Sequence, residues 1–335
     1  MTENDVYYFR IRDEAYGLGI GRTPLAPIGT RGDTRIFAKL EYFNRFKSIK
    51  DRASFFMIRD MIYKGKLTKD KVILEASSGN TGIAIANIAR MLGIAAEIIV
   101  PAGSSPETKD AIRRSGQSLT VMGGDSQPGA RISIDPAIDM VKSMIREHPE
   151  KYVNLDQYSN RNNTMAHYYT TGPEIVESLS GKYPTHVVIC IGTGGTLTGL
   201  ATYFKKFSPS TKIIGVEPEK EHHIQGLKNL SVSKVPEIID LNRGLVDEWI
   251  TVTDEMAISE TKNLLKRHGL FVGLSSGANA AAARKVAENT DHGTIVTVFP
   301  DSAEKYRSVY TYRGIFTEKE FDENIHLVSQ GSFIK

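Results

Sequence analysis

Several short segments combine glycine with small hydroxyl or amide residues at the junction between a predicted strand and a predicted helix. The first, residues 75–82 (EASSGNTG), follows an apolar run that ends near Glu75. Side-chain oxygens at such a junction cap the following helix, and the first backbone N–H groups of that helix can hold an anion. A plain helix cap is the simpler interpretation, but a cap needs only one serine or asparagine. We therefore favour a carboxylate site, formed by Ser77, Ser78, Gly79, Asn80 and Thr81.

The second segment follows the apolar run His186–Ile191 and consists of Gly192, Thr193, Gly194, Gly195 and Thr196. It has no basic residue, so its backbone N–H groups and the dipole of the next helix would bind an anion. A dinucleotide site is the competing interpretation, and Glu217 at the end of the following strand favours it. The G-x-G-x-x-G fingerprint, however, requires glycine at position 197, where the chain has Leu197. A single phosphate is the better prediction.

The third feature is a lysine, Lys50, in residues 44–52 (NRFKSIKDR), which open a helix near Asp51. A lone lysine at a strand–helix junction is usually only solvated. A lysine amine, a cradle for one phosphate and a carboxylate loop are, however, the three elements that a pyridoxal-phosphate enzyme requires. Residues 273–278 (GLSSGA) also precede a helix and carry Ser275, but alone they are a weak signal.

Apolar runs rich in valine and isoleucine alternate with stretches of helical periodicity through most of the chain. The predicted strands are Ile36–Leu40, Val72–Glu75, Ala96–Val100, Leu119–Met122, His186–Ile191, Lys212–Val216 and Thr294–Phe299. The predicted helices are Asp51–Tyr63, Asn80–Leu92, Thr108–Ser115, Pro136–Arg146, Thr196–Phe207 and Asp254–His268. This alternation is typical of an α/β fold with mostly parallel sheets, whose ligands bind at the carboxyl ends of the strands. Residues 123–130 (GGDSQPGA) are predicted to form a turn-rich loop.

Length and composition narrow the class of protein. The 335 residues are about twice the usual domain size, which predicts two domains that share a cleft. A formal net charge of +3 is too small to indicate a nucleic-acid partner. Residues 1–12 are polar, and no stretch is long enough to cross a bilayer, so we expect neither a signal peptide nor a membrane partner. One cysteine, Cys190, excludes an intramolecular disulfide and favours the cytoplasm, and His222–His223 lack further ligands for a metal.

Together, and in this order along the chain, the motifs resemble those of the cysteine synthase and cystathionine β-synthase family, the fold-type-II pyridoxal-phosphate enzymes. The similarity runs from residues 21–25 (GRTPL) to residues 300–306 (PDSAEKY), which is most of the chain. Residues 48–52 (SIKDR) are similar to the family's S-x-K-D-R segment, and residues 78–82 (SGNTG) are similar to its substrate loop.

The resemblance implies a role for each matching residue. Lys50 would form the Schiff base with pyridoxal 5'-phosphate, and Ser275 would face the pyridine nitrogen. Asn80 would bond the ring oxygen, while the phosphate would lie on Gly192–Thr196. The substrate carboxylate would be bound by residues 77–81 and by Gln157, which lies in residues 156–160 (DQYSN).

The resemblance also implies the architecture of the tryptophan synthase β family, with two three-layer α/β domains and the cofactor in the cleft between them. The smaller, mobile domain would comprise residues 46–154 and carry Lys50 and the substrate loop. Residues 1–45 and 155–335 would form the larger domain with the phosphate turn. A homodimer is expected on the same ground.

The implied reaction is a β-replacement that makes L-cysteine from an activated serine and a sulfur donor, through an external aldimine and an aminoacrylate. Lys50 would remove the α-proton. O-Acetyl-L-serine has a neutral leaving group, whereas O-phospho-L-serine brings a dianion that needs a cation. Lys228 lies where phosphoserine-using members place an arginine, residues 162–168 (NNTMAHY) also resemble that branch, and Arg45 and Lys47 add charge near Lys50. We therefore favour O-phosphoserine, with a solvated Lys228 as the alternative.

Other activities share parts of this pattern. Cystathionine β-synthase activity, from serine and homocysteine, uses the same core motifs. A threonine or serine dehydratase is disfavoured because those relatives usually read S-F-K-x-R-G around the lysine. A cofactor-free relative that binds metabolites or a partner protein is disfavoured because Lys50, Asn80 and Ser275 are retained, and a colourless purified protein would support it.

Overall fold

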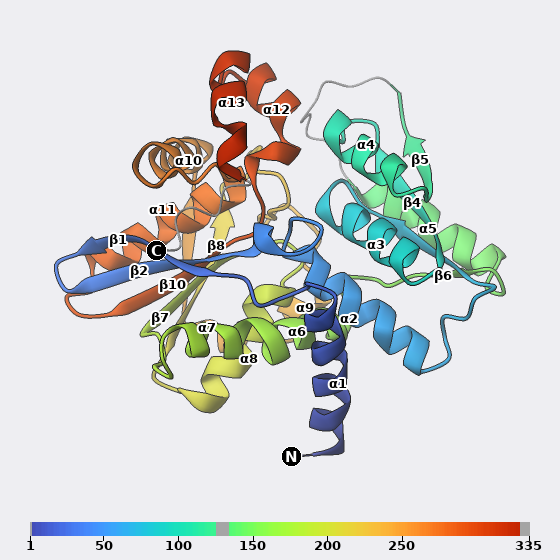
Figure 1. Ribbon diagram of the computed structural model, residues 1–335, viewed down its shortest axis with the longest axis horizontal. Helices are drawn as coiled ribbons and strands as arrows, with labels where there is room; N and C mark the ends of the chain where they lie inside the picture. Colours follow the sequence, from blue (N-terminus) through green and yellow to red (C-terminus); the bar gives the residue numbers. More distant parts are fainter. Residues whose placement is uncertain (1, 125–133, 329–335) are drawn as a thin grey trace.

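The computed structural model of the protein describes residues 2–124 and 134–328, and these residues contain two separate sheets (Figure 1). The six-stranded sheet runs in the order β1 (Leu25–Arg31), β2 (Thr34–Leu40), β10 (Thr294–Phe299), β7 (His186–Cys190), β8 (Lys212–Pro218) and β9 (Glu248–Val252). The four-stranded sheet runs in the order β5 (Ser118–Met122), β4 (Ala95–Pro101), β3 (Val72–Ala76) and β6 (Tyr152–Val153).

Neighbouring strands are parallel throughout both sheets, except that β1 and β2 form an antiparallel hairpin. All seven predicted strands are present, and the predicted mixed α/β fold with mostly parallel sheets is confirmed. Most of the predicted loop 123–130 lies outside the described residues. Within the described residues, no helix is both long and apolar enough to span a bilayer.

Helices cover both faces of the six-stranded sheet (Figure 1). One face carries α10 (Asp254–His268) and α11 (Leu274–Glu288), with α12 (Arg307–Tyr312) and α13 (Glu318–Asn324) beyond them. The other face carries α7 (Gly172–Ser178), α8 (Gly195–Phe207) and α9 (Glu237–Asp240). Short 3₁₀ helices are η1 (Glu41–Phe43), η3 (Arg243–Leu245), η4 (Ala303–Lys305) and η5 (Ile325–Val328).

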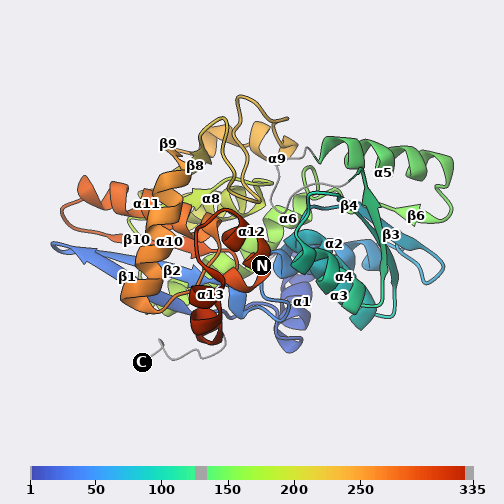
Figure 2. The same ribbon diagram turned by 90° about the horizontal axis from the view of Figure 1, so that it is seen from above.

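The four-stranded sheet also lies between helices, and Figure 2 shows it beside the larger sheet. One face packs against α2 (Lys50–Tyr63), α3 (Asn80–Met91) and α4 (Pro106–Arg114), and the other against α5 (Asp135–Glu147). The core on the first of these faces also contains residues of α1 (Glu3–Gly17), of α6 (Arg161–Ala166) and of the π-helical turn η2 (His167–Thr171).

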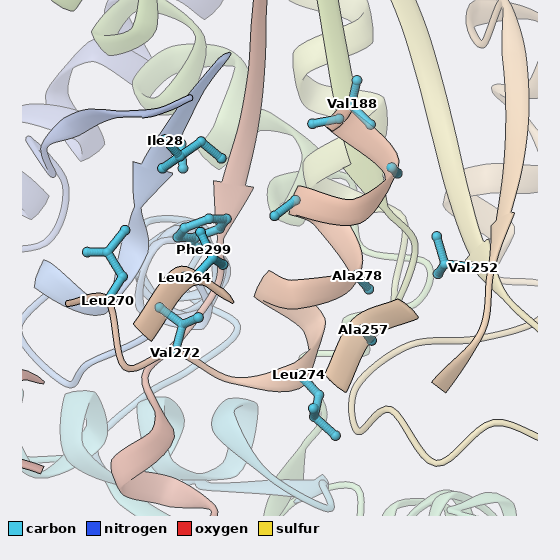
Figure 3. Packing of buried hydrophobic residues seen from close by; sticks show 14 of the residues in the cluster. Ile28, Val188, Val252, Ala257, Leu264, Leu270, Val272, Leu274, Ala278 and Phe299 are labelled. Atoms are coloured by element: carbon cyan, nitrogen blue, oxygen red, sulfur yellow. The ribbon is translucent and has the colours of Figure 1, made fainter. Parts of the chain in front are cut away.

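The central strands of both sheets, such as β4 and β7, are buried on both faces, which explains why they are nearly continuous apolar runs. Successive residues of a strand point to opposite faces. In β7, Val187 and Ile189 belong to the core under α8, while Val188 belongs to the core under α11. Figure 3 shows Val188 and Ala278 of α11 among the buried residues of this second core.

Close packing of α11 against α10 positions the amino end of α11. A side chain at Gly277 would lie 2.2 Å from the backbone oxygen of Ala257 in α10, so only glycine allows this spacing. Ala278, Ala280 and Ala282 are fully buried and let α11 lie close against the sheet. The first turn of α11, which carries Ser275, is therefore held at the carboxyl edge of the strands.

Candidate active site

A cavity of about 540 Å³ lies at the carboxyl ends of strands from both sheets. The predicted site residues that line it are Lys50, Ser77, Ser78, Gly79, Asn80, Thr81, Gln157, Gly192, Thr193, Gly194, Thr196, Lys228 and Ser275. Gly195 is the one predicted site residue that does not line it, and it is the first residue of α8. The structure thus brings together segments that are more than 200 residues apart in the chain.

Lys50 is the first residue of α2, and the segment before it is tied to the end of β10. The backbone N–H of Ile49 donates to Pro300 O at 2.9 Å, and Ser48 pairs with Asp301 in an isolated β-bridge. Within the described residues, the Lys50 amine has no hydrogen-bond or ion-pair partner. Burial lowers the pKa of Lys50, and the negative charge of Asp301 opposes this shift.

The turn that follows β7 leads directly into α8, a helix of 13 residues. Gly194 has a φ of +88°, in the left-handed region where glycine is favoured. A side chain at Gly192 would lie 2.3 Å from Gly226 O, so glycine is needed there for a second reason. The turn therefore exposes backbone rather than side chains to the cavity, at the positive end of the helix dipole.

Two side chains outside the predicted set of site residues, Asn163 and His167, contact this turn. Asn163 Nδ2 donates to Thr193 Oγ1 at 2.9 Å and to Gln157 O at 2.7 Å. His167 Nε2 lies 3.2 Å from Thr196 Oγ1. The pKa of His167 is well below its ordinary value because the ring is buried and, secondarily, because Arg52 is positively charged, so the imidazole is neutral.

The loop between β3 and α3 combines a helix cap with a binding surface. Ser77 Oγ accepts a hydrogen bond from Gly82 N–H at 2.8 Å and so satisfies a free N–H group in the first turn of α3, whose N-cap residue is Gly79. Thr81 Oγ1 donates to Gln157 Oε1 at 2.7 Å, which joins two residues that were both predicted to contact a carboxylate. Ser78 is exposed, and Asn80 is half-buried.

Ser275 lies in the first turn of α11, and a second amide links it to the end of β7. Asn279 Nδ2 donates to Ser275 O at 3.0 Å, and Asn279 Oδ1 accepts from Cys190 N–H at 2.8 Å. These bonds hold the Ser275 hydroxyl beside the turn that follows β7. Cys190 is half-buried and lines the cavity, and desolvation raises the pKa of its thiol.

A family model described as pyridoxal-phosphate dependent enzyme matches residues 16–301. The chain belongs to this family. A cysteine synthase from Aquifex aeolicus is 39% identical over 331 residues, which is 96% of this chain and 97% of that protein. A crystal structure of a cysteine synthase from Entamoeba histolytica has a TM-score of 0.80 and 32% identity, and the match covers 93% of this chain and 94% of that one.

A third similar protein is an O-acetylserine-dependent cystathionine β-synthase from Helicobacter pylori. Its crystal structure has a TM-score of 0.78 and 33% identity, with 88% of this chain and 96% of that chain covered. The family resemblance inferred from the motifs is confirmed, and pyridoxal phosphate is the cofactor of this chain.

The residues of the cavity fit pyridoxal phosphate. The unpaired amine of Lys50 is available for the aldehyde. The turn Gly192–Thr196 needs glycine at two positions, because a Cβ would lie 2.3 Å from Gly226 O at Gly192 and 2.3 Å from Ile239 at Gly194. The start of α8 in this turn can present backbone N–H groups to a phosphate. Ser275 and Asn80 line the same cavity and could bond the ring.

The sequence predicted cationic charge from three residues, Lys228, Arg45 and Lys47, but only Lys228 lies at the cavity. Lys228 lines the cavity, and its ammonium lies 5.0 Å from the centre of the Tyr158 ring. Arg45 and Lys47 are exposed, and neither lines the cavity. Arg45 donates to Leu18 O at 3.0 Å and Lys47 acts on the buried Lys305, so the charge that they add near Lys50 stays a prediction.

Four further residues line the cavity after β10: Pro300, Asp301, Lys305 and Tyr306. They lie in the motif 300–306 that carried the resemblance, but sequence reasoning assigned them no role. The contacts of Asp301, Lys305 and Tyr306 with Asn80 become visible only in the fold. Among the described residues, no group of three or more histidine, cysteine or acidic residues could hold a metal ion.

Proposed function

We propose that the protein makes L-cysteine by β-replacement, and that O-phospho-L-serine is its activated substrate in preference to O-acetyl-L-serine. The observation that carries the reaction type is the unpaired amine of Lys50 in one cavity with the turn 192–196 and the loop 77–81. The similarity to cysteine synthases over nearly the full chain supports the same reaction. The position of Lys228 supports the choice of substrate.

In this proposal Lys50 attaches the cofactor through its amine and then moves the proton at Cα. Pyridoxal phosphate, when bound, supplies an electron sink for the negative charge that develops at Cα. A lowered pKa helps Lys50, because more of its amine is neutral and ready to accept a proton near neutral pH. Ser275 offers the pyridine nitrogen a neutral hydroxyl, which does not favour protonation of the ring.

The remaining contacts divide between cofactor and substrate. We infer that Gly192, Thr193, Gly194, Gly195 and Thr196 bind the phosphate and that Asn80 bonds the ring oxygen. We infer that residues 77–81 and Gln157 bind the substrate carboxylate. The hydrogen bond between Thr81 and Gln157 supports this division, because it joins both partners on one side of the cavity.

The phosphoserine preference rests on how Lys228 is held. Its backbone N–H donates to Ile191 O at 2.9 Å, so the residue is fixed beside the phosphate turn. Its side chain is half-buried and faces Tyr158, the neighbour of Gln157. Burial lowers the pKa of Lys228, and the charge of Asp135 opposes this shift. Partial removal of the Lys228 ammonium from water costs free energy. Attraction to a dianionic leaving group offsets this cost, whereas a neutral acetyl group does not.

O-Acetylserine sulfhydrylation is the second candidate for this site, since it needs no cation at Lys228. Cystathionine β-synthase activity is the third, and the structure from Helicobacter pylori favours it. These alternatives share Lys50 and the phosphate turn and differ in the leaving group or the nucleophile. A cofactor-free binding protein is the non-enzyme alternative.

An absorbance titration of the purified protein separates these candidates. With pyridoxal phosphate bound, we expect visible absorbance that changes at low O-phosphoserine concentration and only at higher O-acetylserine concentration. A change with O-acetylserine alone would assign the second candidate, and a change with serine and homocysteine the third. A protein that stays colourless with added pyridoxal phosphate would contradict the catalytic proposal, and Lys50→Ala should lose the protein-bound absorbance.

A pair of lysine variants tests the substrate branch. Lys228→Ala should lower kcat/KM for O-phosphoserine by about tenfold or more, the scale of one charge-assisted hydrogen bond. Its effect on O-acetylserine should stay below about threefold on the same scale. Lys234→Ala is the matched control, because Lys234 is exposed, lies nearby and does not line the cavity. Equal losses on both substrates would remove Lys228 from the specificity argument.

We also infer, from the family resemblance, that the protein is a cytoplasmic homodimer and that residues 46–154 move as a unit against residues 1–45 and 155–335. Light scattering on the purified protein should give twice the mass of one chain. Small-angle X-ray scattering should show a smaller radius of gyration when a substrate analogue is added to the holoenzyme. An unchanged radius would contradict the mobile-domain inference.

A further inference from the structure

The segment after β10 holds the Asn80 amide at both ends. Asn80 Nδ2 donates to Asp301 Oδ2 at 2.5 Å, and Asn80 Oδ1 accepts from Lys305 Nζ at 2.8 Å. Tyr306 donates its hydroxyl hydrogen to the same oxygen of Asp301. Asp301 and Lys305 are buried, so this pair of opposite charges is shielded from solvent.

The same segment also contacts the residues that lead to Lys50. Pro300 O accepts the Ile49 N–H at 2.9 Å, and Lys305 Nζ donates to Phe46 O at 3.1 Å. The charge of Asp301 acts on the Lys50 amine and raises its pKa against the effect of burial. One short segment therefore binds the Asn80 amide directly, holds the backbone just before Lys50, and places the charge of Asp301 near the Lys50 amine.

The hydrogen bonds that the Asn80 side chain already makes limit which of its atoms can bind the cofactor. A side-chain amide has two N–H donors and one carbonyl acceptor. Lys305 occupies the oxygen, and Asp301 takes one N–H. The second N–H has only a 3.4 Å contact with the Tyr306 hydroxyl, so it is the donor left for a ring oxygen. A reversed amide would place its oxygen against the Asp301 carboxylate, which is unfavourable.

We propose that Asp301 and Lys305 are positioning residues of the β-replacement, which lock the Asn80 amide so that one N–H faces the cofactor ring. This inference rests on the proposed function, because it concerns the same cofactor. The two residues act through Asn80 and do not take part in bond making. Without this pair, the amide is free to present its oxygen to the cofactor, where it repels the ring oxygen.

Other charged groups lie near Asp301 and Lys305 and affect the pKa values of these two residues. Against the effect of burial, the negative charges of Asp51 and Glu304 raise the pKa of Lys305, and the positive charge of Lys47 lowers it. Asp51 also accepts a hydrogen bond from Phe46 N–H at 2.6 Å. Burial raises the pKa of Asp301, and Lys305 opposes that shift. Loss of either partner leaves the other charge buried with fewer partners. For this reason the test needs a readout besides stability.

The experiment uses the holoenzyme with Asp301→Asn, Lys305→Met and Lys305→Arg. The first two should shift the absorbance maximum of the bound cofactor and lower kcat at least about tenfold, the scale of one lost hydrogen bond to a charged group. Lys305→Arg retains a donor and should recover both properties in part. Lys319→Met is the matched control, because Lys319 is exposed on α13. Wild-type spectra and kcat in Asp301→Asn and Lys305→Met would overturn the inference.

Tyr306→Phe provides a second variant that keeps both charges. It removes one hydrogen bond to Asp301 and should shift the spectrum in the same direction by a smaller amount, with the thermal midpoint close to wild type. An unchanged spectrum in Tyr306→Phe and in both neutralising variants would count against the inference even if those variants are less stable. A wild-type protein that does not bind pyridoxal phosphate would instead contradict the proposed function, so the two failures are distinguishable.

Discussion

Thr81 and Gln157, 76 residues apart in the chain, are joined by a buried hydrogen bond of 2.7 Å from Thr81 Oγ1 to Gln157 Oε1. Thr81 lies in the first turn of α3, and Gln157 lies between β6 and α6. Because the amide oxygen of Gln157 is occupied, its NH₂ group is the free end. This end is a donor, as a carboxylate-binding side chain requires.

Replacement of Thr81 by valine tests this arrangement. Thr81→Val keeps the shape of the side chain but removes the donor to Gln157, so the amide of Gln157 loses its orientation. We expect KM for the activated serine to rise about tenfold, with kcat and the cofactor absorbance near wild type. Thr81→Ser should behave like wild type because it retains the hydroxyl. A wild-type KM in Thr81→Val would show that the bond does not orient Gln157.

His167 provides a test on the other side of the cavity. His167→Phe keeps a planar ring but removes the contact with Thr196 in the phosphate turn. We expect the Kd for pyridoxal phosphate to rise about tenfold, while the spectrum of the saturated protein stays unchanged. His148→Phe is the control, since His148 is exposed and is the C-cap residue of α5, on the opposite face of the four-stranded sheet from η2. Equal Kd values for His167→Phe and wild type would exclude a positioning role for His167.

The elements around the candidate segments were predictable because their patterns are local. Strands such as β7 are buried on both faces, so they stand out as apolar runs between glycine-rich turns. The hairpin strand β1 was missed because it contains Pro27 and Gly29, between which its register shifts. The helix α1 was missed because charged residues dominate it, although Tyr8, Ile11 and Ala15 are buried.

The site was predictable only in part, for a different reason. Lys50 and the phosphate turn carry glycine, lysine and helix-start patterns that a single chain reveals. Asn163, His167 and Asp301 act across large sequence separations, and nothing local to them signals a contact. Lys47 lies three residues from Lys50 in the chain, but it is exposed and does not line the cavity.

A buried charge cluster next to Lys50 predicts a strong effect on stability. Glu174 pairs with Arg52 of α2 at 2.6 Å and with Lys39 of β2 at 2.7 Å, and all three are buried. Glu174→Gln leaves the two cations with less compensation, so the free energy of unfolding should fall by about 3–5 kcal/mol. Asp110→Asn breaks the exposed pair with Arg113 and should change it by less than about 0.5 kcal/mol. Urea denaturation measures both, and similar effects of the two substitutions would contradict the prediction.

Glu75, at the end of β3, predicts a pH dependence of stability. Its Oε2 accepts hydrogen bonds from Asn154 Nδ2 at 2.9 Å and from Leu155 N–H at 3.2 Å, but burial dominates and raises its pKa to about 8. The unfolded chain releases this proton near pH 4.5. The folded state therefore holds one more proton between these values, and the contribution of Glu75 to stability is complete below pH 4.5 and declines as the pH rises toward 8.

Glu75→Gln removes this titration and keeps a hydrogen-bond acceptor. The thermal midpoint of Glu75→Gln minus that of wild type should therefore increase between pH 5 and pH 8, by several degrees because about 1 kcal/mol corresponds to 2–4 °C in a protein of this size class. Glu150→Gln, at an exposed position, should parallel wild type over the same range. Parallel curves for Glu75→Gln and wild type would mean that Glu75 is already ionised in the folded protein. The residues around Glu75 would then have to compensate a negative charge beside the loop 77–81.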